Sequence, residues 1–198
     1  ELNIVSCHIG SGASICAVKN GKSFDTSMGF TPLEGIIMNT RSGDIDPAVV
    51  EYICNKEGKT VSEVLTMLNK KSGLFGLTNG VADMRDILEN MNRADVKLAF
   101  DMYCHRIKKY ICSYFGILGG ADAIVFTAGC GEHTPELREA VTNGLEFLGI
   151  KVDHGKNFGA KRGEECEISS ADSKVKVFII PTNEELVIAQ ETEKLLKK

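Results

Sequence analysis

The sequence predicts an α/β fold, and three observations support this. Residues 2–27 alternate short apolar runs with turn signals, which is typical of consecutive strands. Residues 46–115 instead repeat apolar side chains at helical spacing. The remaining chain twice shows a continuous apolar run followed by a helical pattern, beginning at residues 123 and 175. This order predicts one α/β domain with three strands, then helices, then two strand-helix pairs.

Three strands are expected near the N-terminus, at residues 2–7, 13–18 and 22–27. A glycine-rich turn separates the first two, and Asn20-Gly21 separates the second from the third. Asn-Gly is a strong hairpin signal because both residues accept a positive φ. We therefore predict a three-stranded antiparallel meander.

Capping residues mark the first two predicted helices. Asp46 and Pro47 suit the N-cap and the first helical position of one helix. Thr60 and Glu63 form a capping box for the next helix, and Gly73 is expected to end it.

Two further helices are predicted at residues 83–90 and 93–115. The second has an apolar face that exceeds what one neighbouring sheet needs, which predicts a homodimer. The alternative is that the chain's own sheet and helices cover the whole face. This face consists of Ala99, Met102, Tyr103, Ile107, Tyr110, Ile111 and Tyr114.

The apolar runs 123–127 and 175–180 are expected to be buried strands. The first is typical of a strand that is covered on both faces. A helix is expected after each strand, beginning at Thr134-Pro135 and at a capping box of Thr182 and Glu185.

Composition excludes several classes of protein. The chain has 198 residues, a formal net charge of −4, 43% hydrophobic and 25% charged residues, so it is neither disordered nor collagen-like. It has no run of basic residues, so neither nucleic acid nor a membrane surface is an expected partner. The most apolar long segment, 94–118, carries six charged residues and is not expected to span a bilayer.

The cysteines and histidines do not suggest a metal site. The chain has seven cysteines without a CxxC pair, which argues against a disulfide framework or a zinc ribbon. Reduced, buried thiols in a cytoplasmic protein are expected. The four histidines lack the spacing of metal ligands.

Three turns at strand ends could bind phosphate, because glycine lets backbone N–H groups approach an oxyanion. Each turn alone is weak evidence, since glycines at turns usually serve only the turn geometry. Their occurrence at successive strand ends strengthens it, because ligands of α/β sheets bind there. The turns are residues 8–12, 128–132 and 181–185.

Two side chains near these turns have open interpretations. His8 is either a structural histidine or a hydrogen-bond donor to phosphate. Arg41 either binds a carboxylate or phosphoryl group through its planar fork or pairs with Asp44 or Asp46 in its own loop.

Two acidic residues at helix starts are also ambiguous. Asp83, with Arg85, could be a helix cap and a surface charge. Glu184 either faces a pocket, where it can bind Mg²⁺, or complements the helix dipole.

Five ungapped runs resemble the acetate kinase family, within the superfamily of acetate and sugar kinases, heat-shock 70 proteins and actin. The resemblance extends over essentially the whole chain, but to only one half of the family's protein. It implies that residues 1–198 are the C-terminal nucleotide-binding and dimerising domain, with the N-terminal half absent. The implied fold is a ribonuclease-H-like (actin-like ATPase) domain, a mixed sheet with helices on both faces. The runs are residues 8–12, 25–35, 40–47, 126–132 and 181–186.

The resemblance also implies roles for single residues. His8 would face the transferring phosphoryl group, Arg41 would hold the acyl phosphate, and Glu184 would help to hold Mg²⁺. The residues implied to cradle ATP phosphates are His8, Ile9, Gly10, Ser11 and Gly12. Those implied to contact the nucleoside are Asp83, Met84, Arg85, Gly129, Cys130, Gly131, Glu132 and His133.

One position and one short segment depart from the family pattern. Ser11 stands where the family usually has asparagine. Residues 128–133 read Ala-Gly-Cys-Gly-Glu-His where the family usually has Gly-Gly-Ile-Gly-Glu-Asn.

The implied activity is reversible transfer of the ATP γ-phosphoryl group to acetate, giving acetyl phosphate and ADP. The isolated chain is expected to be inactive, because the family's N-terminal half supplies the catalytic aspartate. The alternatives are a propionate kinase of the same family and a non-catalytic module that binds nucleotide or assembles subunits.

Overall fold

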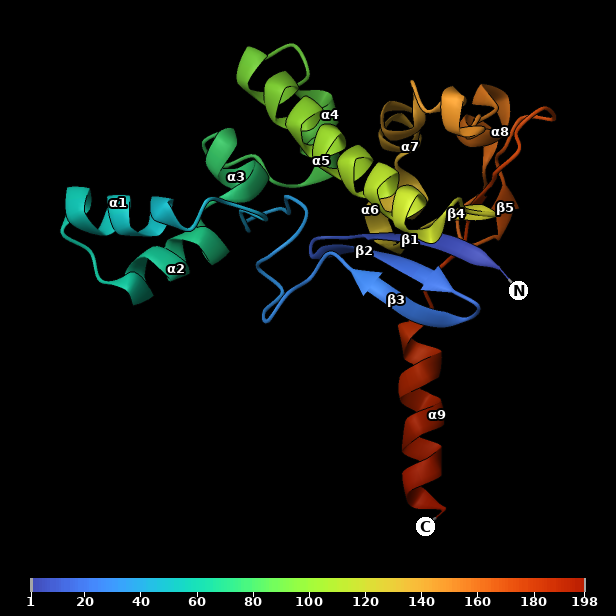
Figure 1. Ribbon diagram of the computed structural model, residues 1–198, viewed down its shortest axis with the longest axis horizontal. Coiled ribbons are helices and arrows are strands. Elements are labelled where there is room, and N and C mark those ends of the chain that lie inside the picture. The colour runs from blue at the N-terminus through green and yellow to red at the C-terminus, as the bar shows by residue number, and fades with distance from the viewer. Residues whose placement is uncertain (1, 198) are drawn as a thin grey trace.

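The computed structural model describes residues 2–197, and within them the strands form one six-stranded mixed sheet (Figure 1). The strand order is β3-β2-β1-β4-β6-β5. Strands β1, β4 and β6 are parallel, whereas β2, β3 and β5 each pair antiparallel with a neighbour. The strands are β1 Asn3–Ile9, β2 Ala13–Lys19, β3 Lys22–Thr26, β4 Ala123–Thr127, β5 Cys166–Glu167 and β6 Lys176–Ile179.

The helices follow the strands in the order that the sequence predicts, with additional short ones. Helix α5 is the longest and crosses β1 and β2. The α-helices are α1 Ala48–Glu57, α2 Val61–Lys70, α3 Gly73–Leu77, α4 Met84–Glu89, α5 Ala94–Leu118, α6 Ala128–His133, α7 Pro135–Thr142, α8 His154–Gly159 and α9 Glu184–Leu196, and a 3₁₀ turn η1 covers Glu146–Leu148.

The predicted antiparallel meander is confirmed, including its hairpin. Asn20 and Gly21 have φ values of 52° and 74°, which is the left-handed conformation that this two-residue turn requires. The predicted α/β class is also confirmed, because the sheet is mixed and helices connect its parallel strands.

The two sides of the sheet are covered unequally. Helices α5, α6 and α7 lie on one side, and α9 projects away on the other (Figure 1). Strand β4 therefore differs from the prediction of a strand covered on both faces, because Ile124 and Phe126 are fully buried while Val125 is only half-buried.

The hydrophobic core lies between the covered face and α5. From the sheet it takes alternate residues of β1, β2, β4 and β6, which is the period-two pattern of a sheet covered on one face. These residues are Val5, Cys7, Ile9, Ala13, Ile15, Ala17, Ile124, Phe126, Val177 and Ile179.

The predicted helix boundaries need three corrections. Gly73 does not end α2, which stops at Lys70; it begins α3 with φ +60°, where a Cβ would lie 2.2 Å from the Met38 carbonyl oxygen. Thr134 precedes α7, but its side chain does not cap that helix. The capping box of Thr182 and Glu185 is wrong as well, because Asn183 caps α9 by accepting a hydrogen bond from Leu186 N at 3.0 Å.

Other predicted caps are confirmed. Thr60 and Glu63 form the capping box of α2, with both reciprocal bonds present. Asp46 Oδ1 accepts a hydrogen bond from Ala48 N at 2.9 Å at the start of α1, although Pro47 is the residue that immediately precedes the helix.

The apolar face of the long helix is largely buried within the chain itself. Tyr103, Ile107 and Ile111 are fully buried and Tyr114 is nearly so, whereas Met102 remains 39% exposed. Most of the surplus that predicted a homodimer is therefore absent from this face.

Within residues 2–197, no helix is long and apolar enough to cross a membrane. All seven cysteines are free thiols; Cys7 and Cys104 are buried and the other five are half-buried.

Candidate functional site

The first predicted phosphate turn lies at the junction of β1 and β2. His8 is half-buried and pairs with Ser14 on one side and Thr127 on the other. The Ile9 side chain is fully buried in the core, so Ile9 can meet a ligand only through its backbone. Gly10 N donates to Gly12 O at 3.1 Å, which makes the turn tight and leaves Ser11 exposed at its tip.

The second predicted turn lies directly beside the first, because β1 and β4 are parallel neighbours. A Cβ on Gly10 would lie 3.6 Å from the Ala128 Cβ. The expected turn at residues 128–132 is the short helix α6, which begins immediately after β4. The sheet therefore brings these two turns together, and the third turn lies beside the second, because β6 is the parallel neighbour of β4.

Arg41 approaches the first turn from the loop before α1. A Cβ on Gly12 would lie 3.4 Å from Arg41 Nη1. Nη1 makes only two long contacts, at 3.5 Å each, to the Pro32 carbonyl oxygen and the Met38 sulfur. Within residues 2–197 no carboxylate lies within 4 Å of the Arg41 guanidinium.

The alternative that Arg41 pairs with an aspartate of its own loop is wrong. Asp44 instead accepts a hydrogen bond from Tyr110 Oη at 2.8 Å and lies 3.4 Å from Arg106 Nη1. Burial and this bond to Asp44 raise the pKa of Tyr110 above its usual range. Asp46 is occupied at the start of α1. The arginine is thus left free to bind an anion.

Asp83 and Arg85 form a pair at the start of α4. The Asp83 side chain caps the helix by accepting from Arg85 N at 2.9 Å, and the guanidinium donates two further bonds of 3.0 Å to its two oxygens. These bonds from Arg85 lower the pKa of Asp83 to about 2. The cap interpretation is therefore confirmed, and the pair also forms part of the wall described next.

A hollow of about 390 Å³ joins these parts. It connects the tip of the first turn, the start of α4 and the exposed side of α6. Most of its lining comes from residues that the sequence predicted. It is lined by Gly10, Ser11, Asp83, Met84, Arg85, Gly129, Cys130, His133, Thr134 and Arg162.

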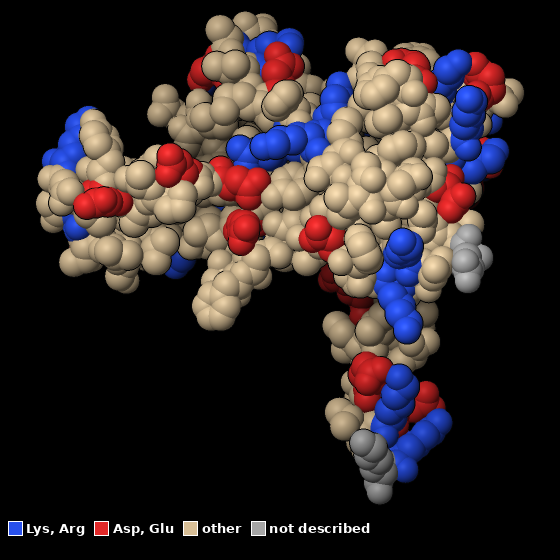
Figure 2. All heavy atoms as spheres, in the orientation of Figure 1, with Lys and Arg blue, Asp and Glu red and all other residues tan. Residues whose placement is uncertain are grey.

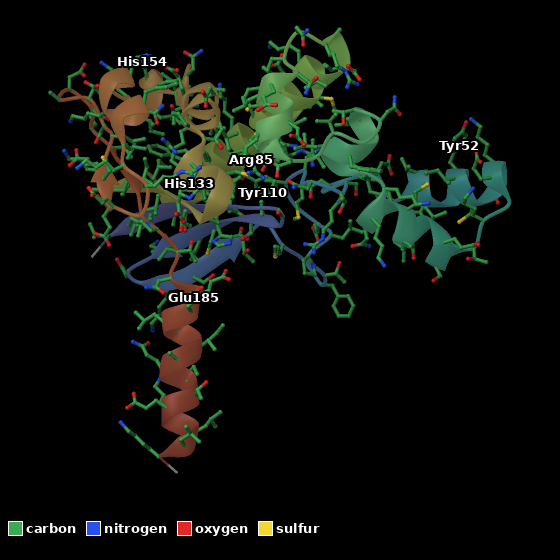
Figure 3. All side chains as sticks on the ribbon, turned by 180° about the vertical axis from the view of Figure 1, so that it is seen from behind. Tyr52, Arg85, Tyr110, His133, His154 and Glu185 are labelled. Carbon is green, nitrogen blue, oxygen red and sulfur yellow. The ribbon has the colours of Figure 1, made fainter. Side chains whose placement is uncertain are left out.

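A second hollow, of about 520 Å³, lies between α6 and the root of α9. Gly129 and His133 line both hollows, so the two hollows adjoin at α6. Figure 3 shows Arg85 and His133 near one another above the sheet, and Glu185 at the root of α9. The second hollow is lined by Ala128, Gly129, Glu132, His133, Thr182, Asn183, Glu184 and Glu185.

Glu132 and Gly131 do not line the first hollow, although both belong to the predicted nucleoside segment. Gly131 is buried against β1 and β4, and Glu132 accepts a hydrogen bond from Thr182 N at 2.8 Å. Cys130 does line the hollow, and burial raises the pKa of its thiol.

Arg138 on α7 is a structural feature that the sequence did not reveal. Its side chain is 1% exposed and donates to Gly131 O, Glu132 O, Asn157 O and Asn157 Oδ1 at 2.8–3.0 Å. Burial lowers the pKa of its guanidinium to about 10, so it stays protonated at neutral pH. Arg138 thereby fixes the C-terminal end of α6.

Arg162 is the other residue that sequence reasoning missed. It lies in the segment between α8 and β5, and it lines the first hollow opposite residues of α4 and α6. No glycine pattern, cap or apolar period marks its place in the sequence.

The arrangement can bind a phosphorylated ligand. The first turn offers glycine backbone, with the Arg41 guanidinium beside Gly12, and the hollow extends from Gly10 and Ser11 to α4 and α6. His8 belongs to the same turn, but neither His8 nor Arg41 lines the hollow. Within residues 2–197 no group of three or more His, Cys, Asp or Glu side chains could hold a metal ion by itself.

Comparison with known proteins gives a consistent result. The sequence profile of the acetokinase family matches residues 1–190. An acetate kinase of Caldicellulosiruptor saccharolyticus is 52% identical over 200 residues, and one of Thermotoga petrophila is 55% identical over 201 residues. Both matches cover the whole of this chain and 50% of the relative. The chain thus spans about half the length of these curated relatives.

Comparison with solved structures gives the same result as comparison with the curated sequences. The crystal structure of Porphyromonas gingivalis acetate kinase matches with a TM-score of 0.92 and 44% identity, over 98% of this chain and 49% of that chain. A propionate kinase from Francisella tularensis matches with a TM-score of 0.88 and 42% identity, over 96% of this chain and 49% of that chain.

Proposed function

Because this chain belongs to the acetokinase family, we propose that it is the C-terminal, nucleotide-binding half of an acetate kinase. The complete enzyme would transfer the γ-phosphoryl group of ATP to acetate, giving acetyl phosphate and ADP, and would also catalyse the reverse reaction. The N-terminal half would be a further segment about as long as this chain, since the relatives are about twice as long as this chain.

The observation that carries this proposal is the position of Arg41. It lies beside Gly12 with no carboxylate partner within residues 2–197, and the half-buried His8 belongs to the same turn. Phosphoryl transfer depends mainly on positioning and on neutralising the charge of the transferring group. In this function, Arg41 would contact the equatorial oxygens of that group, and His8 would donate a hydrogen bond to it.

The nucleotide would lie in the first hollow. The backbone of residues 8–12 would contact the phosphates, because Gly10 and Ser11 line the end of the hollow nearest Arg41. The nucleoside would lie between α4 and α6, where Asp83, Arg85 and His133 present polar groups. The Met84 side chain is 4% exposed and would contribute apolar contact only.

Mg²⁺ would bind in the second hollow, at the root of α9. Mg²⁺ usually takes one or two protein carboxylates and fills its remaining positions with water and substrate phosphate, so a cluster of three protein ligands is not required. Glu184 is an exposed carboxylate that lines this hollow and would hold the ion directly or through water. When bound, the ion would neutralise phosphate charge.

The chain alone would bind nucleotide without turning over acetate. Its residues would contact only one side of the transition state. Because catalysis depends on interactions that stabilise the transition state, the chain alone would lack those of the other side. The residues that complete the acyl pocket would come from the other half.

A propionate kinase is the second candidate. It is favoured by the match to the Francisella tularensis propionate kinase, whose TM-score is close to that of the Porphyromonas gingivalis acetate kinase. Acetate and propionate differ by one methylene, so a change in the acyl pocket would suffice to switch preference.

We also propose a cytoplasmic homodimer. The face of α5 that first suggested a dimer is mostly covered, but apolar side chains remain exposed elsewhere. They include Val49, Tyr52, Val61, Leu65, Leu98, Met102 and Ile117, on α1, α2 and α5. Light scattering tests this: a mass of about twice 21.5 kDa supports the dimer, and a mass near 21.5 kDa contradicts it.

The function is tested by complementation. The chain is assayed for acetyl phosphate formation from ATP and acetate, alone and mixed with the N-terminal half of an acetate kinase relative. We expect activity only in the mixture, with propionate assayed in parallel to decide the acyl preference. A chain that binds ADP but gives no activity in any mixture would instead be a non-catalytic nucleotide-binding module.

A further inference from the structure

Helix α9 is held to the rest of the chain only at its root. None of its residues is buried, and Leu186, Val187 and Ile188 are at least half exposed. Figures 1 and 2 show the helix projecting away from the sheet. Near its C-terminal end, Lys194 pairs with Glu191 and Lys197 with Glu193, all within the helix and its cap. The placement of its first turn therefore depends on the residues that precede it.

Thr182 makes most of the polar contacts at this root. Its hydroxyl lies 2.6 Å from Thr127 Oγ1 and accepts a hydrogen bond from Ala128 N at 3.1 Å. Its backbone N–H donates to Glu132 Oε1 at 2.8 Å. One residue thus contacts the end of β4, the beginning of α6 and a carboxylate near the end of α6.

One of these partners has a strained backbone. Ala128 has φ +64°, a left-handed conformation that residues with a Cβ rarely adopt. Such a conformation persists only where the surroundings impose it. The hydrogen bond from Ala128 N to Thr182 is one of the contacts that hold it there.

A simple capping role does not explain Thr182. The capping residue of α9 is Asn183, whose side chain accepts from Leu186 N. The Thr182 hydroxyl is directed to β4 and α6 instead, so its removal leaves the helix cap intact.

We propose that Thr182 is a positioning residue that holds Glu184 against the α6 wall of the nucleotide site. Thr182, Glu132 and Glu184 line the same hollow, on either side of the gap between α6 and α9. With Thr182 in place, the distance between a nucleotide bound along α6 and an ion held by Glu184 is fixed. The link to nucleotide and Mg²⁺ rests on the proposed function, whereas the contacts of Thr182 do not.

The first part of the test measures the contact itself. Amide hydrogen exchange is followed in the 198-residue chain and in the variants Thr182→Val, which lacks the hydroxyl, and Thr182→Ser, which keeps it. Ala128 N–H should exchange at least tenfold faster in Thr182→Val and at the normal rate in Thr182→Ser. Ile180 N–H, which donates to Phe126 O at 3.0 Å, should stay protected. Equal exchange at Ala128 in all three proteins would overturn the proposal.

The second part measures the consequence for Glu184. ADP affinity is determined with and without Mg²⁺ for the same proteins. We expect Thr182→Val to lose most of the gain in ADP affinity that Mg²⁺ gives, about tenfold, and Thr182→Ser to keep it. A purely structural defect would weaken ADP binding equally in both conditions, and that result would overturn the positioning role.

Thr192→Val is the matched control. Among residues 2–197 its hydroxyl bonds only to Ile188 O within α9, so neither readout should change. If the unmodified chain binds no ADP, the proposed function fails and the role toward Glu184 fails with it, while the exchange rates still decide the contact.

Discussion

Arg41, beside the first turn, and Arg138, at the end of α6, have opposite environments. Arg138 is buried, and four backbone or amide oxygens accept its hydrogen bonds. Arg41 is half-buried, and its guanidinium makes two contacts at 3.5 Å beside the glycine turn. One arginine is satisfied by the protein and the other is not.

This difference separates an arginine that stabilises the fold from an arginine that can bind a ligand. Arg138 uses four of its five N–H donors inside the protein, whereas a guanidinium without a carboxylate partner gains most when an anion binds. We therefore expect changes at Arg138 to act first on stability and changes at Arg41 to act on phosphoryl transfer.

The largest effect is expected for Arg138→Met. Its acceptors, including Gly131 O and Glu132 O, would lose their donor inside the protein, and each unsatisfied buried group costs about 1–3 kcal/mol. We expect the free energy of unfolding to fall by about 3–5 kcal/mol in urea denaturation. Arg93→Met, which removes an exposed arginine paired with Asp95, is the control and should cost about 1 kcal/mol or less. Equal losses in the two variants would show that the buried bonds of Arg138 support the fold no more than an exposed ion pair does.

Arg41→Lys should show the reverse pattern. A lysine keeps the charge but cannot form the two-point contact of a guanidinium, so turnover in the complemented enzyme should fall by about a hundredfold, or about 2.7 kcal/mol in activation free energy. The melting temperature should change little, because Arg41 has no strong partner to lose. Normal turnover would show that Arg41 serves only its own loop.

Glu184→Gln separates a metal role from a helix-dipole role. Loss of a negative charge at the start of α9 should cost no more than about 1 kcal/mol of stability. If Glu184 holds Mg²⁺, the Mg²⁺ concentration that half-saturates the complemented enzyme should rise about tenfold. Glu185→Gln tests the neighbouring carboxylate of the same hollow and should shift the Mg²⁺ titration less. A Glu184→Gln enzyme whose Mg²⁺ titration equals that of the unmodified enzyme would assign the ion to another group.

The smallest effect concerns the pair at the start of α4. Because the bonds from Arg85 lower the pKa of Asp83 to about 2, the Asp83 carboxylate stabilises the fold above about pH 4, and this contribution disappears as the pH falls through 2. NMR titration of the Asp83 side chain should give a midpoint near 2. In Arg85→Ala the midpoint should return toward 4, the ordinary value of an aspartate. A midpoint near 4 for Asp83 in the unmodified chain would mean that the pair of Asp83 and Arg85 does not form in solution.

The sequence predicts the elements whose signals are local. The hairpin at Asn20-Gly21, the capping box at Thr60 and the long apolar period of α5 each depend on residues within a few positions, and all three are confirmed. The glycine turn and Arg41 were also identified locally, and the parallel pairing of β1 with β4 places residues 8–12 beside α6.

The remaining features depend on contacts between distant residues. Arg138 is recognised as a support only once Asn157 and the end of α6 are placed around it. Thr182 was assigned to a capping box because Glu185 follows at the usual spacing, yet its hydroxyl is used by Thr127 and Ala128, more than fifty residues earlier in the chain. Short helices such as α3 and α8 carry too few residues to show a period.

The central claim is that a nucleotide lies between the first turn and α6, and NMR titration of the ¹⁵N-labelled chain with ADP tests it most directly. We predict saturable shifts in the amides of Gly10, Gly12, Gly129 and Cys130, with the amides of α1 unchanged. The absence of saturable shifts at millimolar ADP, or shifts confined to α1 and α2, would contradict the account.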